Sequence, residues 1–253
     1  MKQTTDFKVH ENIDFGRAVL LRLRSKNSLL SICPGQFANV QVNNSPSTYL
    51  RRPISIHDVD DDNNEISLLI QKVGEGTKHL AELKYGDKVN LVYPLGHGFS
   101  MPSSRERVLL VGGGIGIAPL FFFAKMLNEN GIRPTLLLGG KTKDDLLRLV
   151  DYQRLGDVFV TTEDGSLGEK GFVTAHSIWK NQVFDKIYVC GPKPMMKAVA
   201  AMAKEKDVWC EVSLENLMAC GLGACLCCVE DTIDGNVCVC KEGPVFNIRR
   251  LKW

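Results

Sequence analysis

"VLLVGGGIGIAPLFFFAKMLNENG", residues 108–131, is the stretch that decides the fold. A short apolar run passes through a glycine-rich turn into a longer run that ends at Gly131. This pattern predicts a buried strand, a tight turn and a helix. Glycines in such a turn let a diphosphate approach the main chain at the N-terminus of the helix, although they also serve simply to pack helix on sheet. The glycines concerned are Gly112, Gly113, Gly114 and Gly116.

Strands and helices continue to alternate downstream, which predicts a doubly wound parallel α/β sheet. The expected strands read "PTLLLGG", "VFVTTEDG" and "KIYVCG", and helices are expected in 143–156, near 171–180 and over 193–206. Upstream, five short runs rich in Val, Ile and Leu predict an antiparallel barrel or sandwich with one short helix at 77–83. The acidic run "DVDDDNNE" between two of these strands reads as a solvated turn.

Composition excludes several classes of function. The 253 residues are 44% hydrophobic and 24% charged, with a formal net charge of +2, which does not favour a nucleic-acid partner. The polar start "MKQTTDFKVHEN" is not a secretory signal. Residues 108–124 carry no charge, but they are too short and too rich in Gly and Pro for a membrane span. We therefore expect a cytoplasmic protein with reduced thiols.

Six of the nine cysteines lie between Cys220 and Cys240. Cys220, Cys225 and Cys228 have the C-x4-C-x2-C spacing typical of a 2Fe–2S cluster whose fourth ligand is distant in sequence. Gly221 and Gly223 permit the tight loop that such a site needs. A zinc site and a redox C-x-x-C pair are the alternatives. Spacing leaves the fourth ligand open between Cys238 and Cys240, and Cys227 is too close to Cys228 to share the cage easily.

The three remaining cysteines are Cys33, Cys190 and Cys210, and each is expected to be a small buried apolar residue. Cys190 also ends a predicted parallel strand and begins "CGPKPM". Ligands bind at the carboxyl ends of such strands, so Cys190, Gly191 and Pro192 are candidates for a nicotinamide site. Glu163, beside Asp164 at another strand end, is a candidate for the ribose hydroxyls, with a solvated turn as the alternative.

Two stretches of the predicted barrel contain candidate anion-binding groups. "RRPISI", residues 51–56, offers Arg52 for a pyrophosphate and Ser55 for the edge of a flavin ring. "GEGT", residues 74–77, offers main-chain donors ahead of the short helix. Taken alone, Arg52 would be interpreted as part of a surface ion pair.

Together, R-x-x-S, G-G-G-x-G-x-A-P and C-G-P-x-x-M occur in the order that resembles the ferredoxin–NAD(P)H reductase superfamily, over residues 7–206. With the cysteine segment and its "VCKEGPVF" tail, the chain resembles the electron-transfer subunits of B-type dihydroorotate dehydrogenases. The resemblance implies an FAD-binding β-barrel over 1–102, an NAD-binding α/β domain over 103–208 and a 2Fe–2S domain over 209–253.

The same resemblance implies cofactor contacts. Those with FAD would come from Arg52, Pro53, Ile54, Ser55, Leu69, Ile70, Gln71, Gly76 and Thr77. Ile54 stands where the superfamily often has an aromatic residue. The fourth cluster ligand in the family precedes Lys-Asp/Glu-Gly-Pro, which here is Cys240, leaving Cys227 and Cys238 as bystanders.

The resemblance also implies a function in pyrimidine biosynthesis. Electrons from dihydroorotate would pass from an FMN-containing catalytic subunit through the 2Fe–2S cluster and FAD to NAD⁺, in a heterotetramer of two subunits of each kind. The alternatives are a subunit of a transhydrogenase or hydrogenase, and a zinc-binding interaction module without enzymatic function.

Overall fold

The computed structural model describes residues 2–43, 45 and 47–253, so the first residue of the expected barrel domain lies outside it. The chain forms two compact units. The first contains residues 1–98, 216–230 and 236–244, and the second contains residues 99–215, 231–235 and 245–253. The residues expected to form a cluster domain, 209–253, are thus shared between the two units.

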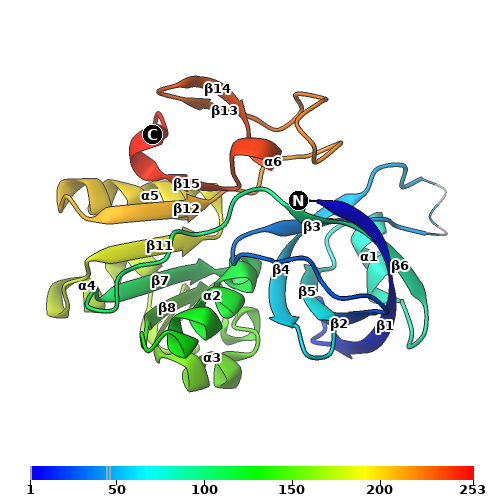
Figure 1. Ribbon diagram of the computed structural model, residues 1–253. Coiled ribbons are helices and arrows are strands. Elements are labelled where there is room, and N and C mark those ends of the chain that lie inside the picture. The colour runs from blue at the N-terminus through cyan, green and yellow to red at the C-terminus, as the bar shows by residue number, and fades with distance from the viewer. Residues whose placement is uncertain (1, 44, 46) are drawn as a thin grey trace. The chain divides into compact units, whose positions relative to one another are not determined.

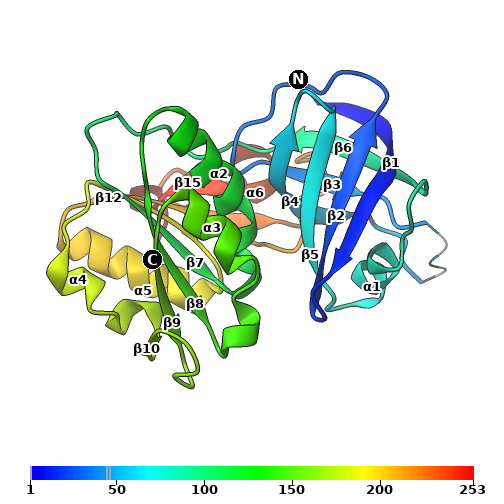
Figure 2. The ribbon, with the colours of Figure 1, turned by 90° about the horizontal axis from the view of Figure 1, so that it is seen from below.

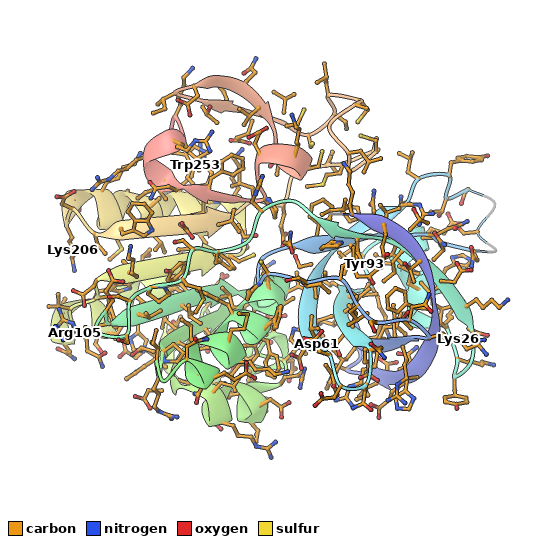
Figure 3. The ribbon with its side chains drawn as sticks, viewed as in Figure 1. Lys26, Asp61, Tyr93, Arg105, Lys206 and Trp253 are labelled. Carbon is orange, nitrogen blue, oxygen red and sulfur yellow. The ribbon has the colours of Figure 1, made fainter. Side chains whose placement is uncertain are left out.

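The first unit is built on a closed antiparallel barrel with strand order β1-β2-β5-β4-β3-β6 (Figure 1). Its elements are β1 (Gln3–Asp14), β2 (Ala18–Ser25), β3 (Phe37–Val40), β4 (Arg52–Asp60), β5 (Glu65–Gln71), helix α1 (Glu75–Ala81) and β6 (Lys88–Leu95). Apolar side chains fill the barrel, and Tyr93 lies among them, packed edge-on against Phe7 (Figure 3). The expected barrel is confirmed.

Strand β1 is the barrel element that the sequence pattern did not predict. Only Phe7 and Val9 among its twelve residues are fully buried, and its other positions are exposed or half-buried. Apolar residues at two alternate positions are a weak strand signal. The strand forms because it pairs on both sides, with β2 and with β6.

The acidic run is a turn, as predicted. It joins β4 to β5, which pair through Asp60 and Glu65. The Asp60 carboxylate accepts a hydrogen bond from the Asn63 main-chain N–H at 3.0 Å, and Asn64 has a φ of 52°. Aspartate and asparagine stabilise turns through such side-chain bonds, which explains this cluster of polar residues.

The second unit is a seven-stranded sheet in the order β10-β9-β8-β7-β11-β12-β15. All its pairs are parallel except β12 with β15. The strands are β7 (Val108–Gly113), β8 (Thr135–Gly140), β9 (Asp157–Thr162), β10 (Glu169–Lys170), β11 (Lys186–Cys190), β12 (Trp209–Ser213) and β15 (Val245–Asn247). The predicted doubly wound sheet is therefore confirmed.

Helices cover both faces of this sheet. Figure 2 shows α2 (Ala118–Glu129) and α3 (Leu149–Leu155) on one face, and α4 (Ile178–Asn181) and α5 (Lys193–Glu205) on the other. Short 3₁₀ turns occur at Gly114–Ile117, Lys143–Asp145, Val173–Ala175 and Ile248–Arg250. Phe123 of α2 packs against Phe99 and Tyr188, with ring centroids 5.0 and 4.7 Å away. This aromatic cluster anchors α2 to the sheet.

Two expected helices are short. The short helix expected within 143–156 is α3, which begins after Arg148, whose φ of 57° is left-handed. The helix expected near 171–180 is only a 3₁₀ turn followed by the four residues of α4. Within the described part of the chain, none of the helices has both the length and the apolar character needed to cross a membrane.

The cysteine segment contains the hairpin of β13 (Val229–Thr232) and β14 (Gly235–Cys238), followed by helix α6 (Val239–Glu242). Beyond the hairpin, Val245 of β15 pairs antiparallel with Ser213 of β12. The chain therefore leaves the large sheet at β12 and returns to its edge at β15, with the cysteines between these two points.

Candidate functional site

The loop from Cys220 to Cys228 contains three left-handed residues. Gly221 and Gly223 have φ values of 70° and 85°, and Leu226 has a φ of 55°. Glycine adopts this conformation without steric cost, whereas a branched residue such as leucine does so rarely. The backbone thereby turns sharply within nine positions, as the spacing of the cysteines predicted.

Main-chain N–H groups point at the sulfur atoms of three cysteines. The N–H of Leu222 donates to Cys220 Sγ at 3.2 Å, and the N–H of Gly223 donates to Cys240 Sγ at 3.1 Å. The N–H of Cys240 itself donates to Cys228 Sγ at 3.4 Å. Such bonds stabilise a sulfur that carries negative charge, which is the state of a metal-bound thiolate.

The two cysteines predicted not to be ligands donate hydrogen bonds through their thiols instead of accepting them. The Cys227 thiol donates to the carbonyl of Leu217 at 3.7 Å, and the Cys238 thiol donates to that of Gly223 at 4.0 Å. A thiol that donates must keep its proton, whereas a ligand must lose it. The direction of the hydrogen bonds thus supports Cys240 rather than Cys238 as the fourth ligand.

The acidity of these thiols follows their surroundings. The main-chain hydrogen bond from Leu222 lowers the pKa of Cys220 to about 6, with further hydrogen bonds from Cys225. Burial raises the pKa of Cys240 to about 12, and the neighbouring Cys228 adds to this. Burial also raises the pKa of Cys238. Cys220 is therefore a thiolate at neutral pH, while Cys240 must release a proton when metal binds.

The expected donor set fits a 2Fe–2S cluster, because four cysteine thiolates are the ligands that hold its two irons. Within the described ranges, no group of three or more His, Cys, Asp or Glu side chains is arranged to hold a single metal ion.

The end of the cysteine segment is fixed to the barrel within the first unit. The N–H of His97 donates to the carbonyl of Gly243 at 2.6 Å, and His97 and Pro244 form an isolated parallel bridge. A Cβ at Gly96 would lie 2.5 Å from that same carbonyl oxygen. The Gly-Pro that follows Cys240 is therefore packed directly against the residues after β6.

The predicted flavin contacts lie on two strands and the start of α1. Residues 52–55 are half-buried on β4. A Cβ at Gly76 would lie 2.8 Å from Arg52 Nε, so the guanidinium rests against the main chain of α1. The Thr77 hydroxyl caps α1 through the main chain of Val73 and Gly74. The structure therefore brings Arg52 and Gly76 together.

The other predicted flavin contacts, on β5, differ in exposure. Leu69 and Ile70 are 3% and 1% exposed, whereas Gln71 is exposed. The side chains of Leu69 and Ile70 are buried, so the main chain is the part of these two residues that a cofactor would reach.

The predicted nucleotide loops meet at the carboxyl ends of β7 and β11. These strands are neighbours, with Gly112 opposite Cys190. A Cβ at Gly116 would lie 2.5 Å from Gly191 Cα, and one at Gly113 would lie 3.0 Å from Pro192. In the sheet, β8 and β9 lie on one side of β7, and β11 and β12 lie on its other side. Ligands of doubly wound sheets bind at such a switch point.

Cys190 is fully buried, and burial raises its pKa well above the ordinary value. It is therefore a neutral thiol at the end of β11. Cys210 is buried as expected, but Cys33 is exposed, so the expectation of a buried Cys33 is wrong. Cys33 precedes Pro34 in a loop, where its N–H donates to Gln36 Oε1 and no apolar layer covers the thiol.

At the end of β9, Glu163 and Asp164 are both exposed. The Asp164 carboxylate accepts bonds from the N–H and hydroxyl of Ser166, which lower its pKa. Thr162, which could have offered a hydroxyl to a nucleotide, is fully buried and bonded to the main chain of Leu167. Glu163 is thus the candidate side chain for ribose at this strand end.

Three family models match this chain in the order of its sites. They are an oxidoreductase FAD-binding domain over residues 8–99, an oxidoreductase NAD-binding domain over 110–201, and the iron–sulfur cluster binding domain of dihydroorotate dehydrogenase B over 215–252. Fold and sites together define a ferredoxin-reductase-type flavoprotein with an added iron–sulfur segment.

Curated relatives narrow this class. A dihydroorotate dehydrogenase B (NAD⁺) electron transfer subunit from Fusobacterium nucleatum is 39% identical over 251 residues, covering 95% of each chain. The Shouchella clausii subunit of the same name is 41% identical over 221 residues, covering 85% of each. The chain belongs to the family of dihydroorotate dehydrogenase B electron transfer subunits.

Solved structures agree with the fold. A structure of NADH-dependent reduced ferredoxin-NADP oxidoreductase superposes with a TM-score of 0.87 at 30% identity, covering 98% of this chain and 90% of that one. The ferredoxin reductase in carbazole 1,9a-dioxygenase superposes with a TM-score of 0.69 at 22% identity, covering 82% of this chain and 67% of that one. The second likeness concerns the fold alone.

Sequence reasoning missed two kinds of site group. The N–H donors of Leu222 and Gly223 belong to the main chain, so no side-chain pattern in the sequence predicts them. The buried amide of Asn39 was also missed, although a polar residue inside the apolar run "FANV" is a signal for it.

The hydrogen bonds around the cysteines predict two pairs of contrasting variants. Cys228→Ser and Cys240→Ser should each lose cluster iron, because a serine oxygen replaces a ligand sulfur. The neighbouring changes Cys227→Ala and Cys238→Ala should retain it, because these thiols donate to carbonyl groups instead. Iron and acid-labile sulfide analysis of the four purified variants checks this, and iron loss in Cys238→Ala alone would overturn the choice of Cys240.

The position of Arg52 against Gly76 predicts its effect on flavin retention. Removing a charge-assisted bond to pyrophosphate costs about 1.5–3 kcal/mol, so Arg52→Ala should bind FAD about 10- to 100-fold more weakly. The control is Arg22→Ala, which removes the ion pairs of another barrel arginine, with Glu11 and Glu65, and none of the expected flavin contacts. Flavin content after gel filtration is the measurement, and equal retention in both variants would exclude the role of Arg52.

Proposed function

We propose that this chain passes electrons derived from dihydroorotate to NAD⁺, in association with an FMN-containing catalytic subunit. The observation that carries this proposal is the cysteine segment, because its three N–H···S bonds reach Cys220, Cys228 and Cys240, three of the four ligands that the family resemblance implies. When bound, the cluster would carry one electron at a time, and FAD would join two electrons into a hydride for nicotinamide.

The residues of this chain would hold these groups in place rather than act as acids or bases on orotate. Cys220, Cys225, Cys228 and Cys240 would ligate the two irons, with main-chain N–H groups balancing the charge on sulfur. Arg52 and the main chain of Gly76 would bind the FAD pyrophosphate, with Pro53, Ser55 and Thr77 nearby and Ile54 providing an apolar contact in place of aromatic stacking. Leu69, Ile70 and Gln71 would contribute through β5.

The nucleotide would lie over the switch point of the large sheet. Gly112, Gly113, Gly114 and Gly116 would let its diphosphate approach the N-terminus of α2. Cys190, Gly191 and Pro192 would line the nicotinamide, where a neutral, buried thiol provides contact without a competing nucleophile. Glu163 would accept hydrogen bonds from the free ribose hydroxyls.

Partner and setting follow from the same proposal. We infer a heterotetramer with two copies of each subunit, as the family resemblance implies, and a cytoplasmic setting that suits nine free cysteines. We also retain 1–102, 103–208 and 209–253 as the functional division into FAD, NAD and cluster segments. The cluster segment is then the part expected to exchange electrons with the partner.

A second function has a specific observation behind it. The structure of the NADH-dependent reduced ferredoxin-NADP oxidoreductase covers 98% of this chain at 30% identity. This chain would then be part of an oxidoreductase that exchanges electrons with ferredoxin. The dehydrogenase is preferred, because relatives with that name are 39–43% identical.

Reconstitution tests the proposed function. When this chain is mixed anaerobically with a B-type FMN catalytic subunit, electrons from dihydroorotate should reduce FAD, which bleaches its absorbance, and should then reduce NAD⁺ to NADH. Cys220→Ser should block that route, because its cluster is lost, while NADH still reduces FAD directly. Stopped-flow absorbance of flavin and NADH follows both routes. If dihydroorotate reduces FAD equally fast in the variant, electrons do not pass through the cluster.

Nucleotide preference is a separate prediction. NADH should reduce the bound flavin far faster than NADPH does, because the carboxylate of Glu163 repels a 2′-phosphate. Glu163→Arg should narrow the difference, whereas Glu129→Arg, the same charge change at the C-terminal end of α2, should not. Flavin bleaching with each nucleotide is the measurement, and equal rates for both in the unmodified chain would contradict the assignment.

A further inference from the structure

Asn39 is a buried amide in the middle of an apolar barrel strand. Its side chain is 1% exposed, and it lies on β3 between Ala38 and Val40, both fully buried. A polar side chain is rarely placed in such a position unless it makes a specific bond, because leaving it unpaired costs about 1–3 kcal/mol. Within the described part of the chain, the neighbouring strands β4 and β6 provide no hydrogen-bond partner for this side chain.

The partner lies 181 positions further along the chain. Asn39 Nδ2 donates to the carbonyl oxygen of Cys220 at 3.0 Å. The next residue, Gly221, packs so tightly that a Cβ there would lie 2.5 Å from the same nitrogen and 3.4 Å from Leu95. The amide therefore holds the main chain at the first cysteine of the loop, and Gly221 leaves the space that this contact requires.

The same residue faces the predicted flavin strand. Asn39 pairs with Pro53 of β4, and paired residues project from the same side of a sheet. The carbonyl of Asn39 accepts a bond from Arg51 Nη1 at 3.3 Å, and that guanidinium also donates to the carbonyl of Asn90 at 2.9 Å. Both ends of Asn39 are thus fixed, one in the barrel and the other at Cys220.

We propose that Asn39 is a positioning residue that sets the placement of the 2Fe–2S cluster relative to the flavin-binding strand. It is not among the expected ligands of iron or contacts of flavin, but it fixes the carbonyl of Cys220, whose Sγ accepts the N–H of Leu222. Residues that orient ligands in this way govern metal retention and tune the metal. The proposal rests on the proposed function, because it takes Cys220 as a cluster ligand.

The structure contains a matched control. Asn12 of β1, in the same unit, also uses Nδ2 as its donor, to the carbonyls of Ala81 and Leu83 at 2.9 and 2.7 Å. Its Oδ1, like that of Asn39, is buried without a partner. Removing either amide should destabilise the barrel in a comparable way, but only Asn39 contacts the cysteine loop.

The experiment compares Asn39→Asp and Asn39→Leu with Asn12→Asp and Asn12→Leu in the full chain loaded with FAD and cluster. Aspartate keeps the shape of asparagine and loses the N–H donor, while leucine avoids a buried charge if aspartate prevents folding. Iron release to a chelator should be about 10- to 100-fold faster in both Asn39 variants. Their reduced clusters should also show a shifted electron paramagnetic resonance spectrum, with FAD content unchanged.

Both Asn12 variants should release iron at the rate of the unmodified chain. The proposal is overturned if the Asn39 variants keep the unmodified rate and spectrum, or if the Asn12 variants show the same changes. If the unmodified chain holds no 2Fe–2S cluster, the proposed function fails together with this inference. A cluster that is present but insensitive to Asn39 refutes this inference alone.

Discussion

Charge on sulfur is the constraint on which the cysteine segment depends. Cluster thiolates need hydrogen-bond donors close by, and here those donors are main-chain N–H groups of Leu222, Gly223 and Cys240. Main-chain donors can converge on sulfur only if the backbone turns sharply, which explains the left-handed residues of the loop. A loop of this kind has few hydrogen bonds of its own, so its position must be fixed by contacts outside it.

The predicted nucleotide-binding loops also depend on main-chain N–H donors. A diphosphate is bound by main-chain N–H groups at the end of a strand, so two loops must approach closely without side chains between them. Gly116 and Gly191 achieve this, since their main chains are in direct contact. That contact depends on β7 and β11 being neighbours, which the doubly wound order of the sheet ensures. Topology and local glycines therefore act together.

Local signals in the sequence predicted most of the fold and the outline of the sites. The strand, turn and helix over 108–131 and the spacing of the first three cysteines each depend on neighbouring residues, so the sequence reveals them directly. The unpredicted features depend on contacts between distant residues. Strand β1 forms by pairing with two other strands. The hydroxyl of Thr162 donates to the carbonyl of Leu167 in the following turn, which the sequence of its strand does not predict. The pairing of Asn39 with Cys220 joins residues 181 positions apart.

The choice of Cys240 as the proposed fourth ligand depends on such distant contacts. Spacing does not distinguish Cys238 from Cys240, and the hairpin of β13 and β14, which ends at Cys238, is short. Cys240 is followed by the Gly243–Pro244 contact with His97, and its sulfur accepts the N–H of Gly223 from the first cysteine loop. The barrel thus holds the cysteine segment near both ends, at Cys220 through Asn39 and after Cys240 through His97. The distance between the two groups of proposed ligands therefore depends on contacts with β3 and with the residues after β6, and not only on the hairpin that connects them.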